Sequence, residues 1–211
     1  MKKIIILTCF NISINLTAFS QNDLLALNTT KTTFEKEDEN DEDYWETELS
    51  PLTHHIEILN FIYRDPYKIH YSNFIPAGYP LRKEIDITSF YGARNHPVHH
   101  VMKFHRGIDL KGNTGEVAIA TGDGVVIDAG FRTDLGNFVK IKHKYGFETI
   151  YGHLSVIKVK KGAKICKNQI VGLVGATGTV TGPHLHYTLK KNGEYMDPFD
   201  FLFMDFKEEN N

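Results

Sequence analysis

The chain has 211 residues, with 24 lysines and arginines, 26 aspartates and glutamates, and a formal net charge of −2. That length accommodates one domain with a hydrophobic core and some additional segments, and the balance of hydrophobic (41%) and charged (24%) residues is that of a globular protein. This composition excludes a collagen, a coiled coil and a wholly disordered chain. Two cysteines also exclude a disulfide-stapled scaffold and a four-cysteine zinc finger, whereas eleven histidines direct attention to metal or acid–base chemistry.

Residues 1–20 have the organisation of a secretory signal peptide. A basic start is followed by an apolar stretch, interrupted by Asn11 and Asn15, and then by the small-x-small site Ala18-Phe19-Ser20. The stretch is too short and too polar for a membrane anchor; a buried N-terminal helix is the alternative. We therefore expect cleavage after Ser20 and export to a bacterial periplasm or cell envelope, or secretion, with no stable membrane span.

An acidic segment follows. Residues 35–48 contain nine acidic residues and one lysine, and like charges at this density repel one another and rarely pack. Residues 21–50 are therefore predicted to be a disordered acidic linker, with an inhibitory pro-segment as the alternative. The remaining residues, 49–211, contain 20 basic and 16 acidic residues, a net charge of +4. This charge suits an anionic polymer but is too small to indicate nucleic-acid binding.

Residues 51–83 are predicted to be a mostly irregular lead-in. Apolar positions at Ile56, Ile58, Leu59 and Ile62 permit one short helix within residues 51–64. Prolines and a glycine between residues 65 and 82 favour irregular structure there.

From residue 84 to residue 203 the pattern predicts short antiparallel strands bounded by glycine, aspartate and asparagine turns. The alternation of Val139, Ile141 and His143 with lysines places one face of the sheet in the core and one in water, so His143 is expected to be a core imidazole. We expect an all-β domain of about seven to nine strands, followed by a C-terminal tail at 204–211. The predicted strands are residues 117–119, 125–129, 138–143, 147–153, 170–174, 184–190 and 195–196.

Two residues with metal-binding side chains, His105 and Asp109, are four positions apart. In an extended chain their Cα atoms would lie about 13 Å apart, too far for both side chains to bind one ion. The chain must therefore bend between them, and Gly107 is the position at which a bend costs least.

Three further histidines lie in predicted strands. His184 and His186 are two residues apart, so both side chains lie on one face of a strand. Residues 175–183 before them form a predicted flexible loop of small residues, a plausible rim for a site, and His153 lies in another strand. With His105 and Asp109, these residues supply the nitrogen and oxygen ligands of a catalytic zinc site and additional imidazoles.

The order and spacing of these motifs resemble those of the lysostaphin/LytM-type zinc metallopeptidases of bacterial cell walls. The resemblance extends from about Ser89 to Leu202. It rests on the stretches Ser89–Arg94, His96-Pro97, Phe104–Leu110, Ala120–Val126, Tyr151–Ser155, Gly172–Gly178, Thr181–His186 and Asp197-Pro198.

The resemblance implies one Zn²⁺ per chain, bound by His105, Asp109 and His186, with His153 and His184 as catalytic histidines that do not bind the metal. It also implies a duplicated hybrid-motif fold, in which hybrid-barrel-like hairpins form a groove around the zinc site. The implied activity is hydrolysis of peptidoglycan cross-links by a metal-activated water, on stem or cross-bridge peptides. The resemblance leaves open which bond is cleaved and which histidine is the general base.

Two other functions are compatible with parts of the same pattern. One is a non-enzymatic envelope protein of the same fold that binds or activates another cell-wall hydrolase. The other is a biotinyl- or lipoyl-like carrier with similar hairpins, which would leave the histidines and the aspartate unexplained.

Overall fold

The computed structural model describes residues 38–64, 73–95 and 101–204. The chain divides into two compact units, residues 1–44 and 45–211, and the second unit contains all of the candidate site residues. The predicted signal peptide, residues 21–37 of the predicted linker and residues 205–211 of the predicted tail lie outside the described residues. Within the described residues, no helix combines the length and the apolar character needed to span a membrane.

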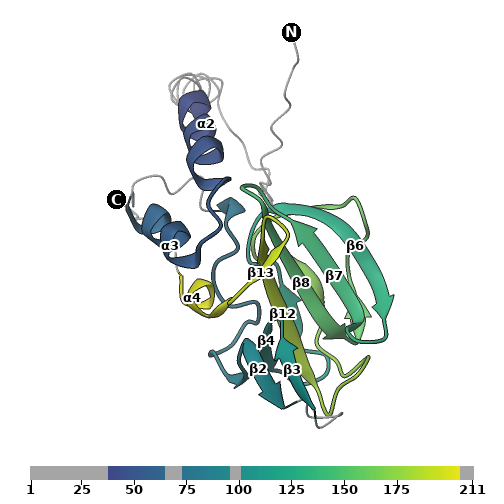
Figure 1. Ribbon diagram of the computed structural model, residues 1–211. Helices are drawn as coiled ribbons and strands as arrows, with labels where there is room; N and C mark the ends of the chain where they lie inside the picture. The colour runs from purple at the N-terminus through teal and green to yellow at the C-terminus, as the bar shows by residue number, and fades with distance from the viewer. Residues whose placement is uncertain (1–37, 65–72, 96–100, 205–211) are drawn as a thin grey trace, which may run out of the picture. The chain divides into compact units, whose positions relative to one another are not determined.

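Antiparallel strands are the main regular structure of the second unit (Figure 1). The larger sheet has the strand order β1 (Ile87–Ser89), β4 (Ile108–Lys111), β12 (His184–Lys191), β8 (Phe147–Leu154), β7 (Gly136–Lys142), β6 (Gly124–Arg132) and β10 (Lys164–Ile165), with β13 (Glu194–Met196) paired to β12. The smaller assemblies are the sheet β5 (Val117–Ile119), β11 (Ile170–Leu173) and β9 (Val156–Ile157), and the pair β2 (Gly92–Asn95) and β3 (Met102–His105). The mostly antiparallel β fold predicted from the sequence is confirmed.

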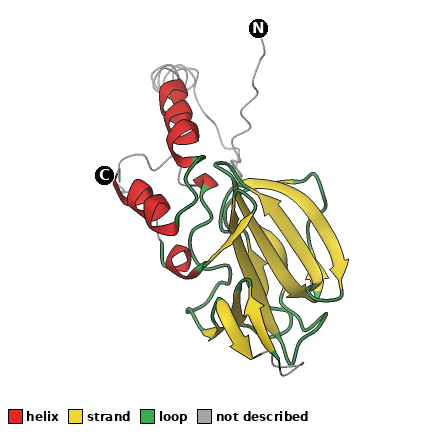
Figure 2. Cartoon of the chain, viewed as in Figure 1, coloured by secondary structure: helices red, strands yellow, loops and turns green. Residues whose placement is uncertain are grey.

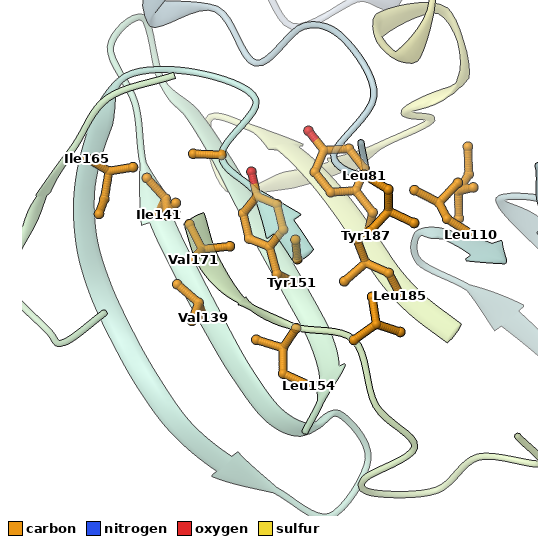
Figure 3. Packing of buried hydrophobic residues seen from close by; sticks show 14 of the residues in the cluster. Leu81, Leu110, Val139, Ile141, Tyr151, Leu154, Ile165, Val171, Leu185 and Tyr187 are labelled. Carbon is orange, nitrogen blue, oxygen red and sulfur yellow. The ribbon is translucent and has the colours of Figure 1, made fainter. Parts of the chain in front are cut away.

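One hydrophobic core contains side chains from the larger sheet and from β11 (Figure 3). Val139 and Ile141 alternate with lysines on β7 and are fully buried, as the period of two predicts. Tyr151 and Tyr187 lie side by side in this core, and the hydroxyl of Tyr187 lies 2.8 Å from Thr121 Oγ1. The buried hydroxyl therefore has a partner, and the core beneath the site strands β8 and β12 is well packed.

A second hydrophobic cluster joins the helices of this unit to the sheet. It includes side chains from the end of α2 (Asp38–Leu49), from α3 (His55–Arg64) and from α4 (Phe199–Leu202), the helices drawn in red in Figure 2. Trp45 of α2 is buried against the rings of Phe61 and Tyr145. The apolar faces of these helices thus pack against residues of the sheet, and residues 45–64 are part of the folded unit.

Three expectations need correction. Residues 38–49 form a helix, although they lie within the segment predicted to be a disordered linker. The acidic run contains Trp45 and Leu49, four residues apart, and burial of this pair outweighs the repulsion between exposed carboxylates.

The predicted number of strands is also too low, because the described residues contain thirteen strands and several have only two to four residues. The short helix α4 was not predicted, whereas α3 confirms the helix predicted within 51–64.

Candidate metal centre

Three neighbouring strands bring candidate ligands together. In the register of the sheet, Asp109 of β4 lies opposite His186 of β12, and on the other side of β12 His186 lies opposite Gly152 of β8. A Cβ atom at Gly152 would lie 3.3 Å from the Cβ of His186, so a larger residue would crowd that histidine. Residues far apart in the sequence therefore converge on one short stretch of the sheet.

His105 reaches the same place because the chain bends at Gly107. His105 is the last residue of β3, and β4 begins three residues later, at Ile108. A Cβ atom at Gly107 would lie 2.5 Å from the carbonyl oxygen of Tyr187 and 2.9 Å from Cε1 of His186. Only glycine allows this close approach, which confirms the predicted bend.

Three ligand atoms form a small triangle. His105 Nε2 lies 3.1 Å from both Asp109 Oδ1 and His186 Nδ1, and His186 Nδ1 lies 2.9 Å from Asp109 Oδ1. All three side chains are buried. Among the described residues, this is the one group of three such side chains with geometry suited to a metal ion.

Hydrogen bonds from the surroundings orient these side chains. His105 Nδ1 lies 2.8 Å from the carbonyl oxygen of Phe90 and must donate to it, so in the neutral ring Nε2 carries a lone pair. Arg94 donates to Asp109 Oδ2 at 3.0 Å, and Thr188 Oγ1 lies 3.1 Å from His186 Nε2. Such outer partners fix the orientation of metal-binding histidines and carboxylates.

The residues fit a bound Zn²⁺ by two criteria. Metal–ligand distances of about 2.0–2.2 Å in a tetrahedron place ligand atoms about 3.3 Å apart, close to the separations measured in the triangle. In addition, nitrogen and oxygen atoms of His105, Asp109 and His186 face one another, an arrangement that a cation between them would stabilise. Burial alone would raise the pKa of Asp109, but the facing imidazoles outweigh it and hold this pKa well below its usual range.

His153 and His184 lie beside this triangle, each anchored through Nδ1. His153 Nδ1 donates to the carbonyl oxygen of Thr177 and His184 Nδ1 to that of Gly182, both at 2.9 Å. The centroids of the two rings are 4.7 Å apart, and His184 Nε2 lies 3.5 Å from Asp109 Oδ1. Because Nδ1 carries the hydrogen in each neutral ring, Nε2 has a free lone pair and can accept a proton.

The environment of the two rings differs. The pKa of His153 is lowered to about 4, mainly because the ring is buried and secondly because the charges of His186 and His184 lie nearby. For His184, burial acts in the same direction, but the hydrogen bond and charge of Asp109 outweigh it and raise the pKa. His153 also has a φ of 61°, a left-handed conformation that is uncommon for a residue with a side chain and concentrates at functional sites.

An open cavity of about 580 Å³ lies over the five residues. Thr179, Val180 and Thr181 from the loop 175–183 contribute to its lining, as expected for a rim. The first part of this loop is held in place, because Thr177 Oγ1 accepts from the Asn137 amide and donates to the Leu154 carbonyl oxygen. The cavity leaves the histidines accessible from solvent.

The structure brings together all five residues that the sequence singled out. Arg94 was not predicted, because it is fifteen positions from Asp109 and belongs to no periodic pattern. Thr188 could have been found, since it continues the alternation of His184 and His186 along one strand face.

His143 lies outside the site, as expected. It is buried and hydrogen-bonded to the Asp123 carbonyl oxygen and to Thr149. The cluster His96, His99 and His100 lies outside the described residues.

Comparison with known proteins finds relatives for the part of the chain that contains these residues. The model of peptidase family M23 matches residues 103–198. Over 122 residues, 56% of this chain and 28% of the relative, the sequence is 39% identical to the peptidoglycan DD-endopeptidase ShyC of Vibrio cholerae. The chain therefore spans little more than a quarter of the length of this curated relative.

Two solved structures are also similar. The catalytic domain of the antimicrobial peptidase lysostaphin from Staphylococcus simulans is 31% identical, with a TM-score of 0.52, over 56% of this chain and 92% of that domain. A zinc-containing peptidase from Vibrio cholerae is 35% identical, with a TM-score of 0.55, over 62% of this chain and 40% of the other. The chain belongs to peptidase family M23, and the resemblance to lysostaphin-type peptidases is confirmed.

Proposed function

We propose that the chain is an exported, zinc-dependent endopeptidase that hydrolyses peptide cross-links of peptidoglycan. The observation that carries the proposal is the buried triangle of His105 Nε2, Asp109 Oδ1 and His186 Nδ1 with two further anchored imidazoles beside it. Membership of family M23 and the similarity to a peptidoglycan DD-endopeptidase support the substrate class.

The proposal assigns His105, Asp109 and His186 to the metal and His153 and His184 to proton transfer. Zn²⁺ in this site would supply the positive charge that polarises a peptide carbonyl and acidifies a water molecule. Two neutral imidazoles and one carboxylate leave such an ion with a net positive charge, so the ligand set suits this chemistry.

His153 and His184 carry out the proton chemistry in this proposal. Each ring is fixed by a backbone carbonyl at Nδ1, which leaves Nε2 for the reaction. One imidazole takes the proton of the attacking water, and the other stabilises the developing oxyanion or protonates the leaving amine. Because both rings are held before substrate binds, little reorganisation accompanies the reaction.

The test is digestion of purified sacculi, with the released muropeptides identified by mass spectrometry. We expect cross-linked dimers to be converted to monomers by addition of water, and a chelator to abolish this conversion. His153→Ala and His184→Ala should each suppress product formation. Binding to sacculi without any change in muropeptides would contradict the enzymatic proposal and favour a binding or activating protein of the same fold.

A further inference from the structure

Two cationic side chains in the cavity lining have no carboxylate partner among the described residues. They are Lys103, two positions before the candidate ligand His105, and Arg106, directly after it. Both line the cavity together with His105. Both side chains are exposed to solvent. They lie beside the candidate metal centre without belonging to it.

The position of Lys103 follows from strand register. On β3, Lys103 and His105 alternate with exposed apolar residues and so share one face. Lys103 also lies directly opposite Arg94 of β2, and like charges in that arrangement repel each other. Arg94 is neutralised by Asp109, whereas Lys103 is not. A bound anion would relieve this repulsion.

Arg106 is positioned by an aromatic ring. Its guanidinium lies 5.0 Å from the ring centroid of Tyr195, which also lines the cavity. A guanidinium held over an aromatic ring by cation–π attraction keeps its N–H donors available to bind a carboxylate in a bidentate manner.

Arg132, another cation of the cavity lining, is in a different state. Arg132 donates to both carboxylate oxygens of Asp134, at 3.1 and 2.7 Å, so its charge is neutralised within the protein. Thr179 and Thr181 add hydroxyl-bearing side chains to that lining. Among the described residues of the lining, Lys103 and Arg106 are thus the two cations without a carboxylate partner.

Resting on the proposed function, we infer that Lys103 and Arg106 form a subsite for a substrate carboxylate next to the scissile bond. A cross-link from D-alanine to a diamino diacid carries a free carboxylate on the carbon attached to the scissile nitrogen. A glycine bridge, or a cross-link to lysine, has none at that position. The positive charge of Lys103 and Arg106 therefore favours the diamino diacid cross-link as the substrate.

The experiment compares two synthetic cross-linked peptides that differ by one carboxylate. D-Alanine is joined to the side-chain amine of meso-diaminopimelate in one peptide and of lysine in the other, and kcat/KM is measured for both. We expect the full chain to favour the diaminopimelate peptide about tenfold or more, the usual contribution of a charge-assisted hydrogen bond.

Variants assign the preference to the two residues. The double variant Lys103→Gln/Arg106→Gln should bring the ratio close to unity while cleavage of the lysine peptide continues. Lys142→Gln, an exposed lysine outside the cavity lining, is the matched control and should retain the wild-type ratio. Equal cleavage of both peptides by the unmodified chain, or an unchanged ratio in the double variant, would overturn the subsite. Failure to cleave either peptide would instead contradict the proposed function.

Discussion

Arg94 and Asp109 form an ion pair at the edge of the candidate metal centre. Arg94 Nη2 donates to Asp109 Oδ2 at 3.0 Å, while the other carboxylate oxygen lies 2.9 Å from His186 Nδ1. The carboxylate is thus held on one side and presented to the histidines on the other. We interpret Arg94 as a positioning residue, which acts on the metal site through Asp109.

Arg94→Gln should weaken metal binding about 10- to 100-fold, the usual effect of losing an outer partner of a ligand. Competition with a chromophoric chelator measures the affinity directly. Arg82→Gln is the control, because Arg82 is exposed and lies outside the cavity lining. Equal metal affinity in the Arg94 variant and the wild type would refute a positioning role.

Gly107→Ala should disturb both the bend and the metal site. Its new Cβ would lie 2.5 Å from the Tyr187 carbonyl oxygen, and overpacking of this kind costs about 1–3 kcal/mol. We expect a lower free energy of unfolding and weaker metal binding. Gly130→Ala, where a Cβ meets no atom within 4 Å, should leave both within error of the wild type. An undisturbed Gly107→Ala variant would show that close packing at this bend is not required.

The second hydrophobic cluster can be tested with two isoleucines of α3. Ile58 is fully buried in the cluster, whereas Ile56 is 67% exposed. Ile58→Ala should lower the free energy of unfolding by about 2–5 kcal/mol, and Ile56→Ala by no more than about 0.5 kcal/mol. Chemical denaturation measures both values. Similar, small effects would mean that this helix does not contribute to the stability of the folded unit.

His143 should make stability depend on pH. Burial lowers the pKa of this imidazole to about 4, from a value near 6.5 in the unfolded chain. The unfolded state therefore binds a proton that the folded state does not, so stability falls as the pH decreases from about 6.5 to about 4. The full effect is about 3 kcal/mol.

Measuring the free energy of unfolding against pH checks this effect. In His143→Gln the slope between pH 4.5 and 6.5 should decrease by the equivalent of about one proton. His54→Gln, a change at an exposed histidine, serves as the control and should keep the wild-type slope. If the slope of the His143 variant is unchanged, this imidazole does not titrate as its burial requires.

The strands of the body were largely predictable because they are local patterns. The alternation of Val139 and Ile141 with lysines marks β7, and β5 occupies the residues that the sequence indicated. The shared face of His184 and His186 likewise follows from a period of two. Such features depend only on neighbours in the sequence.

Other features depend on residues far apart in the chain. Helix α2 ends where the buried amine of Lys191 donates to the carbonyl oxygens of Leu49, 142 residues away, and of Ser50. The pairing of Arg94 with Asp109 arises where two separate sheets meet. No local propensity contains these contacts, so the acidic segment appeared disordered and Arg94 had no predicted role.

Metal content per chain in His186→Ala and His184→Ala tests the central assignment most directly. The two histidines are adjacent on one face of β12, but only His186 belongs to the proposed ligand triangle. Elemental mass spectrometry of the purified proteins should find about one zinc ion per chain in the wild type and in His184→Ala, and almost none in His186→Ala. A wild-type chain without metal, or loss of zinc from His184→Ala with retention in His186→Ala, would contradict the account.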